Sequence, residues 1–280
     1  MLKVASLTCR ARGMSRDDYR AAHIGYHSSC VRRLKGLRGY LVNIRAESST
    51  QDWIADTIAG PMGVERDDVA TDWDGLSQLF FDSIADYRAA RALVQDRPGP
   101  AGLERDERLL DLGGDEAFLY STPPLSFAVD EHVVLPVRRP EHKVFKLVQL
   151  GRKKEGVSDH EFRSAWCTQY ADQVRAAPGL LGYTVNFPQL TDVKTDFYPP
   201  GSSVFSPQAT ERELDFHRRW DGYAELWFTT PEHFVDWRST MHDALRPIEA
   251  EWFDHWCYVE VDETVVVLPD RSAAAPFYHR

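Results

Sequence analysis

The sequence has 280 residues, 43% of them hydrophobic and 12% aromatic, which is enough for two compact domains of ordinary size. Its formal net charge of -10 argues against nucleic acid and anionic membrane surfaces as partners. No apolar run approaches the roughly 20 residues of a membrane-spanning helix, and the N-terminus lacks a signal-peptide pattern, so we expect a cytoplasmic protein. The cysteines are far apart in the sequence and predict free thiols: Cys9, Cys30, Cys167 and Cys257.

The chain contains a long internal repeat, in which three segments of the first half align with three segments of the second. The longest alignment has no gap, and the next one begins with a Trp-Asp-Gly triplet in both halves. The paired segments are 19–43 with 162–186, 73–81 with 220–228, and 130–134 with 262–266. Because the repeat extends over a whole domain, it predicts two copies of one module and not a solenoid of short units.

In the first half, residues 3–10 alternate like a strand, and Ser15 with an acid three residues later marks the start of a helix. Gly36 ends this helix, where a residue tolerant of positive φ is needed. A strand at residues 37–44, a strand after the Trp-Asp-Gly triplet, a second helix near Ser83 and a final strand complete the half. One face of the first helix carries side chains at helical spacing: Tyr19, His23, Tyr26, His27 and Cys30.

The second half repeats this order of elements. Residues 143–150 alternate like a strand, Ser158 caps the next helix, and Gly179 ends it. A strand follows at residues 180–187, and the second helix starts near Pro231. The first helix of this half carries an aromatic and apolar stripe in the matching positions: Phe162, Trp166, Tyr170 and Val174.

Each half is therefore expected to fold as strand–helix–strand–strand–helix–strand. We predict an α+β fold of two ferredoxin-like βαββαβ modules in tandem, each a four-stranded antiparallel sheet with helices on one face. The modules span residues 1–136 and 141–270, and residues 271–280 form a C-terminal tail. The bare sheet faces would pack together as a dimeric α+β barrel, either within one chain or between two chains of a homodimer. Two long excursions, residues 45–72 and 188–219, would either cover a site or be mobile.

Several segments resemble the EthD family of the dimeric α+β barrel superfamily: residues 13–19, 26–34, 36–40, 73–75 and 81–83. His27 matches the histidine of the family's first helix, whereas Ser29 stands where proline is usual. The second half carries the resemblance more weakly, and Tyr170 replaces the histidine there. The resemblance implies the breakdown or tailoring of small aromatic, lactone or ether compounds. The wider superfamily includes isomerases, cyclases, decarboxylases, cofactor-free monooxygenases and haem proteins.

His27 is the first candidate for catalysis, because an imidazole can accept or donate a proton near neutral pH. Tyr26 or His23 could orient it or donate a hydrogen bond to a developing enolate oxygen. Asp74, at the start of a strand, could hold the other imidazole nitrogen in one tautomer. The competing interpretation is that His27 is a hydrogen-bonded histidine at the barrel rim with no catalytic role. In that case His23 packs at the edge of the core.

Aromatic side chains are candidates for binding a flat ligand, and ordinary core packing is the competing interpretation. The candidates are Trp73, Phe81, Trp166, Tyr170 and Trp227. Four histidines of the second half form no HExxH motif or other tight ligand pair and predict no metal site. These histidines are His217, His233, His242 and His255.

Together these features predict a cofactor-independent lyase or isomerase for a small aromatic, lactone or polyketide-like compound. It would act by proton transfer, decarboxylation or elimination through an enolate. The first half would be catalytic, and the second half would complete the barrel. Two other functions stay open: a binding module for small aromatic ligands that performs no chemistry, and a haem or cofactor-free oxygenase.

Overall fold

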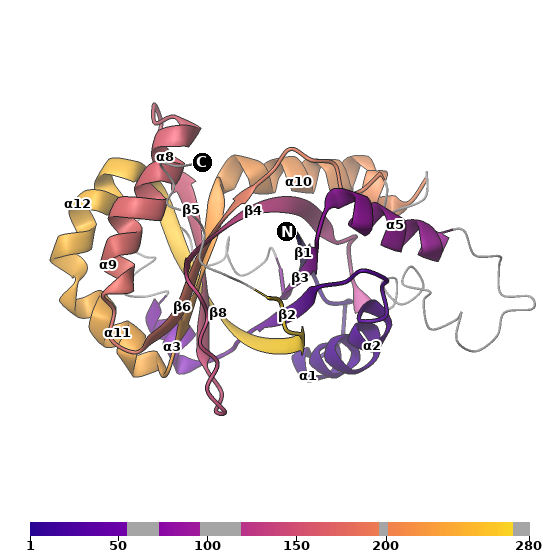
Figure 1. Ribbon diagram of the computed structural model, residues 1–280, viewed down its shortest axis with the longest axis horizontal. Coiled ribbons are helices and arrows are strands. Elements are labelled where there is room, and N and C mark those ends of the chain that lie inside the picture. Colours follow the sequence, from indigo (N-terminus) through magenta and orange to yellow (C-terminus); the bar gives the residue numbers. More distant parts are fainter. Residues whose placement is uncertain (55–72, 96–118, 196–200, 271–280) are drawn as a thin grey trace, which may run out of the picture.

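The computed structural model of the protein describes residues 1–54, 73–95, 119–195 and 201–270 (Figure 1). The strands are β1 (Leu2–Thr8), β2 (Gly39–Arg45), β3 (Gly75–Phe81), β4 (Leu125–Leu135), β5 (Phe145–Lys153), β6 (Leu180–Pro188), β7 (Gly222–Phe228) and β8 (Phe253–Val267). The helices are α1 (Arg16–Ala21), η1 (Ala22–His27), α2 (Ser28–Val31), α3 (Ser49–Ile54), α5 (Ile84–Gln95), α8 (Asp159–Ala165), η4 (Trp166–Tyr170), α9 (Ala171–Arg175), η5 (Ser203–Phe205), α10 (Pro207–Arg219), α11 (Pro231–Thr240) and α12 (His242–Trp252). None of the helices in these described ranges combines the length and the apolar character that a membrane crossing requires.

The strands form one closed antiparallel barrel in the order β1-β3-β2-β8-β5-β7-β6-β4. The two halves of the chain join where β2 pairs with β8, for example Asn43 with Glu263, and where β4 pairs with β6, for example Val133 with Thr184. The predicted fold class, two ferredoxin-like modules whose separate sheets pack face to face, is therefore wrong. Closing the barrel satisfies the backbone N–H and C=O groups that two separate sheets would leave unpaired at their edges. The barrel closes within one chain.

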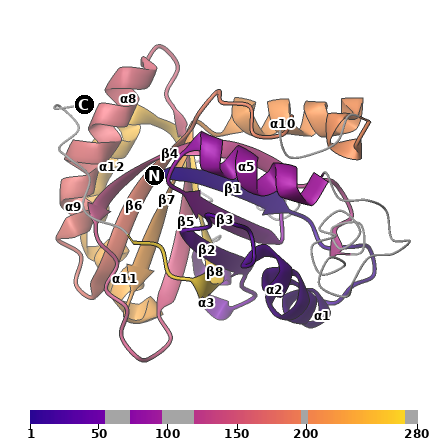
Figure 2. The same ribbon diagram turned by 45° about the vertical axis from the view of Figure 1, so that its right-hand side comes forward.

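Helices cover the outside of the barrel on two sides (Figures 1 and 2). Helices α1, α2 and α5 lie on the side of the first-half strands, and α8, α9, α11 and α12 lie on the side of the second-half strands. Apolar clusters fill the layer between helices and strands on each side, and a third cluster lies within the barrel. The predicted module boundaries stay predictions, and residues 271–280 lie outside the described part.

The predicted signals at the helix ends are confirmed. The Ser15 side chain accepts a hydrogen bond from the backbone of Asp18, and Ser158 forms a complete capping box with Glu161. Gly36 and Gly179 follow the helices with positive φ angles of 81° and 71°. These local signals depend on near neighbours in the chain, so the barrel topology does not alter them.

A buried ion network crosses the barrel interior. Lys3 on β1 donates to Glu225 on β7 at 2.5 Å and to Glu131 at 2.9 Å. Lys146 on β5 donates to Glu225 at 2.7 Å and to Glu263 at 2.6 Å. Since β1 and β7 are not neighbours in the barrel, the Lys3–Glu225 contact must pass through its interior. Each buried cation has carboxylate partners, which offsets the cost of removing these charges from water.

Candidate functional site

The first helix of the chain presents two histidines to the outer surface of the barrel. Its middle part, η1, is a π-helical turn from Ala22 to His27, a form of helix that is common near functional sites. His23 is fully buried and His27 keeps 5% of its surface exposed. We call the side chains gathered here the histidine face: Thr8, Tyr19, His23, His27 and Ser77.

Four members of the histidine face form a continuous hydrogen-bonded chain. The Oγ1 of Thr8 donates to the carbonyl of Gly75 at 3.2 Å and lies 2.7 Å from the Tyr19 hydroxyl. The imidazole of His23 lies between that hydroxyl and Ser77, with 3.1 Å from Nδ1 to Tyr19 Oη and 3.1 Å from Nε2 to Ser77 Oγ. Each hydroxyl has one proton, and that of Thr8 goes to the Gly75 carbonyl, so the Tyr19 hydroxyl donates to Thr8. The oxygen of Tyr19 then accepts from the Nδ1–H of His23. The chain therefore holds neutral His23 in its Nδ1–H tautomer, with Nε2 accepting from Ser77.

Gly75 allows this close approach of side chains. A Cβ atom at position 75 would lie 2.5 Å from Tyr19 Oη and 2.8 Å from Thr8 Oγ1. Any other residue would therefore push the two hydroxyls apart and break the chain of hydrogen bonds. This contact gives the glycine of the first Trp-Asp-Gly triplet a physical role.

Burial sets the protonation of the histidine face. It lowers the pKa of His23 well below its usual value, and the neighbouring His27 adds to this effect. Burial also raises the pKa of Tyr19, so that its hydroxyl stays protonated. The rings of His23 and His27 meet edge to face with their centres 5.0 Å apart, and Tyr120 lies 6.0 Å from His27. His27 is thus the more accessible of two adjacent imidazoles.

The corresponding surface of the second half is closely packed and lacks the four polar side chains of that hydrogen-bonded chain. The helix again contains a π-helical turn, η4, but Phe162 and Trp166 stand where the first half has Tyr19 and His23. Gly151 replaces Thr8, and its Cβ would lie 2.7 Å from the Trp166 ring. We call this set the aromatic face: Gly151, Phe162, Trp166, Tyr170 and Ala224.

On the aromatic face Trp166 donates its indole N–H to the Tyr183 hydroxyl at 3.1 Å, and Tyr170 has a polar network of its own. Its hydroxyl lies 2.9 Å from that of Tyr258 and donates to Glu249 at 3.3 Å, and Glu249 accepts from Arg238 at 2.8 Å. Burial raises the pKa of Tyr170 well above its usual value, and burial also raises that of Tyr258 to about 12. Both phenols are therefore neutral hydrogen-bonding groups of the core.

The structure places two of the four predicted catalytic residues apart from the imidazoles. Tyr26 points outward and is 53% exposed. The carboxylate of Asp74 accepts from the backbone N–H of Arg10 at 2.9 Å and pairs with its side chain at 3.6 Å. His23 and His27 are brought together, as described above. Thr8 and Ser77 were not predicted, although both positions lose their hydroxyl in the second half of the repeat.

The predicted ligand-binding aromatics do not form one pocket. Trp73 lies in the cluster within the barrel, and Phe81 packs on Tyr87 in the layer beneath the first-half helices. Trp227 also faces the barrel interior, where the Lys146 ammonium lies 4.4 Å from its ring centre. Trp166 and Tyr170 are buried on the opposite side of that sheet wall. Ligand binding by these five residues stays a prediction.

Comparison with protein families supports the resemblance inferred from the sequence. Residues 154–256 match the EthD domain. The matched segment lies in the second half and includes the aromatic face from Phe162 onward. No curated protein shows significant similarity to the sequence.

Solved structures share the fold at low sequence identity. A candidate monooxygenase of Fusobacterium nucleatum superposes with a TM-score of 0.53 at 10% identity, covering 98% of this chain and 95% of that chain. A candidate monooxygenase of Lactobacillus acidophilus gives 0.50 at 8% identity and covers 96% of each chain. An anthrone oxidase-like protein gives 0.52 at 10% identity, covering 98% and 96%. At these identities the likeness concerns the fold alone.

Proposed function

We propose that this protein, with its EthD domain at residues 154–256, is a cofactor-independent enzyme that moves protons on small aromatic, lactone or polyketide-like compounds. The histidine face would be its reactive part. The observation that carries the proposal is the chain of buried hydroxyl and imidazole groups from Thr8 to Ser77, which ends beside His27. A buried polar chain costs free energy unless every member is paired, and this chain places a fixed imidazole beside His27, which favours a role in function.

His27 is the proposed acid–base group. It retains 5% exposure, whereas His23 has none, so His27 is the one of the two rings that reaches solvent. Both ring nitrogens of His23 have partners in the chain, which makes it a positioning residue that fixes the ring beside His27. The sequence match to the family's helix histidine supports the same choice.

The reaction would begin with removal of a proton from a carbon next to a carbonyl group. The electron pair of that C–H bond forms an enolate, and the proton moves to the imidazole of His27. Return of the proton to another carbon gives isomerisation, whereas departure of a leaving group from the β-carbon gives elimination. A positioned imidazole typically contributes a rate factor of about 10² to 10⁴ to such a step.

The test is proton exchange measured by NMR in deuterated water, over a panel of aromatic ketones and unsaturated lactones. His27→Ala should lower the exchange rate of the responsive compound by about a hundredfold or more. His242→Ala, which removes an exposed histidine from the start of α12, is the matched control and should leave the rate unchanged. An unchanged rate in folded His27→Ala protein would refute the assignment.

A binding module without chemistry is the second candidate. It is favoured by the complete hydrogen bonding of His23, which is also what a purely structural histidine requires. Tight calorimetric binding of an aromatic compound, with no proton exchange and no product over days, would favour this function.

An oxygenase is the third candidate, suggested by the names of the structures with the same fold. Oxygen uptake with a hydroquinone, or a Soret absorption band in the purified protein, would favour an oxygenase over proton transfer.

A further inference from the structure

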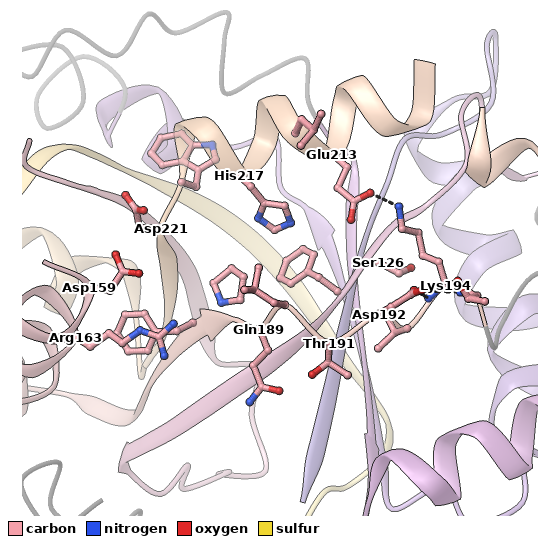
Figure 3. A pocket seen from close by; sticks show the side chains of 18 of the residues that line it. Ser126, Asp159, Arg163, Gln189, Thr191, Asp192, Lys194, Glu213, His217 and Asp221 are labelled. Atoms are coloured by element: carbon pink, nitrogen blue, oxygen red, sulfur yellow. Dashed lines mark hydrogen bonds and ion pairs between the residues drawn. The ribbon is translucent and has the colours of Figure 1, made fainter. Parts of the chain in front are cut away.

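A cavity of about 630 Å³ lies beneath α10 (Figure 3) and has no lining residue in common with the histidine face. Its walls come from β4, α8, the end of β6 with the segment that follows, and α10. The sequence predicted residues 188–219 as an irregular excursion that would cover a site or be mobile, and this excursion supplies α10 and one wall. A volume of this size suits a small organic molecule.

The walls of the cavity are strongly aromatic. Phe127 and Phe216 stack with ring centres 5.6 Å apart, and the guanidinium of Arg163 lies 4.7 Å from the ring centre of Phe187. The aromatic lining residues are Phe127, Phe162, Phe187, Phe205 and Trp220. Such walls favour a flat, apolar ligand, because aromatic rings pack on one another edge to face or in offset stacks.

His217 supplies the polar group of the cavity. Its imidazole extends from α10 toward the cavity and meets the Phe127 ring edge to face at 5.4 Å (Figure 3). Burial lowers the pKa of His217, against the charge of Glu213 and with the help of Lys194, so the ring is neutral at pH 7. Within the described residues neither ring nitrogen has a hydrogen-bond partner. A neutral imidazole therefore offers one donor and one acceptor to a ligand.

The charged side chains at the rim already have protein partners. Lys194 pairs with Glu213, and Asp221 pairs with Arg152 at 3.0 Å. Asp159 pairs with Lys153 and also lines the cavity. Arg163 pairs with Asp130 at 3.8 Å, and the carboxylate of Asp192 accepts hydrogen bonds from Thr195 and the backbone of Lys194. Because these charged groups already have partners within the protein, the rim does not favour a charged ligand. The ligand that fits is neutral, flat and able to make one hydrogen bond.

We propose that this cavity is a second small-molecule site, which binds a neutral hydroxylated aromatic compound whose phenolic O–H donates to the unprotonated nitrogen of His217. The site shares no residue with the histidine face. It therefore does not depend on the proposed function at His27, and it can exist whether or not the protein is an enzyme.

The experiment compares 2-naphthol with naphthalene, which lacks the hydroxyl group, using quenching of tryptophan fluorescence and calorimetry. Wild-type protein should bind 2-naphthol about tenfold more tightly than naphthalene, since one hydrogen bond is at stake. His217→Phe retains the ring and should bind both compounds equally. The matched control, His242→Phe, should behave as the wild type.

A second variant keeps the proposal testable if His217→Phe does not fold. Leu214, which lines the cavity from α10 and is 48% exposed, can be enlarged with Leu214→Trp, which should fill the cavity and abolish binding of both compounds. Unchanged binding of 2-naphthol in both variants would overturn the proposal. If 2-naphthol binding is lost in His27→Ala but retained in the two cavity variants, the ligand binds at the histidine face instead. An unchanged rate of proton exchange in His27→Ala, with normal 2-naphthol binding, would refute the proposed function and leave this site intact.

Discussion

The two helix-covered faces of the barrel share a backbone plan but differ in chemistry. Besides the change of His27 to Tyr170, four changes separate the histidine face from the aromatic face, and together they remove every group of the hydrogen-bonded chain. The corresponding pairs are Thr8 and Gly151, Tyr19 and Phe162, His23 and Trp166, and Ser77 and Ala224. The changes are coupled by space, because the Trp166 ring occupies the volume that a side chain at position 151 would need. A buried polar chain is therefore kept or lost as a unit.

The barrel interior shows the opposite behaviour. Lys3 and Lys146 correspond in the repeat, as do Asn43 and Asn186, and all four take part in the buried ion network. Carboxylates from both halves complete the network, so the loss of either lysine would remove one of the two cations that pair with the buried Glu225. The ion network in the interior therefore joins the two halves, whereas the outer faces of the barrel can differ between them.

The largest effect is expected when the aromatic face receives the threonine of the histidine face. In Gly151→Thr the new Cβ would meet the Trp166 ring at 2.7 Å and the Phe253 ring at 2.9 Å. We expect the free energy of unfolding to fall by about 3 kcal/mol, at the upper end for overpacking a core. Urea denaturation followed by circular dichroism measures this loss.

Two further variants show whether the loss of stability in Gly151→Thr comes from crowding or from threonine itself. In a Trp166→His background the indole that crowds position 151 is replaced by a smaller ring, although Phe253 stays in place. Adding Gly151→Thr should therefore cost less than in the wild type, by about 1 kcal/mol. Gly25→Thr is the control, since nothing lies within 4 Å of a Cβ at that glycine. Equal costs of Gly151→Thr in both backgrounds would show that the two positions are independent.

A smaller effect is expected from giving the histidine face the phenylalanine of the aromatic face. Tyr19→Phe removes the acceptor of the His23 Nδ1–H, which stays buried without a partner, and the donor to Thr8, which keeps its bond to the Gly75 carbonyl. The free energy of unfolding should fall by about 2 kcal/mol. The reverse change, Phe162→Tyr, meets no such chain and serves as the control. A loss below about 0.5 kcal/mol in thermal and urea unfolding would contradict the proposed chain.

The smallest effect concerns the pH dependence of stability. Because the folded-state pKa of His23 lies below its ordinary value of 6.5, the unfolded chain binds more protons at acidic pH. Neutral His23 makes its full contribution to the free energy of unfolding above pH 6.5. This contribution is lost as the pH falls below 6.5, by up to about 1.4 kcal/mol per pH unit. His23→Gln should flatten the stability curve between about pH 6.5 and 5. His217 adds a similar slope in both proteins, so the difference between the curves isolates His23.

Much of the local structure could be predicted from the sequence. Serine caps, the glycines after the first helices and the alternating strands are set by neighbours in the chain, and the structure confirms them. The resemblance to EthD is also supported, over residues 154–256. The helix α10 was missed, although Ser206 caps it and Pro207 begins it, because the segment contains few apolar residues. As a result His217 was counted with the surface histidines.

The sequence by itself determined the repeat, the elements of each half and the place of two histidines on one helix face. Only the tertiary structure decided how the strand edges join, because hydrogen bonds such as those between β2 and β8 connect residues far apart in the chain. The same holds for the contacts of Thr8, Ser77 and His217, whose partners come from other elements. Spacing along one helix reveals which side chains share a face, but the groups that meet that face are fixed by the closed barrel.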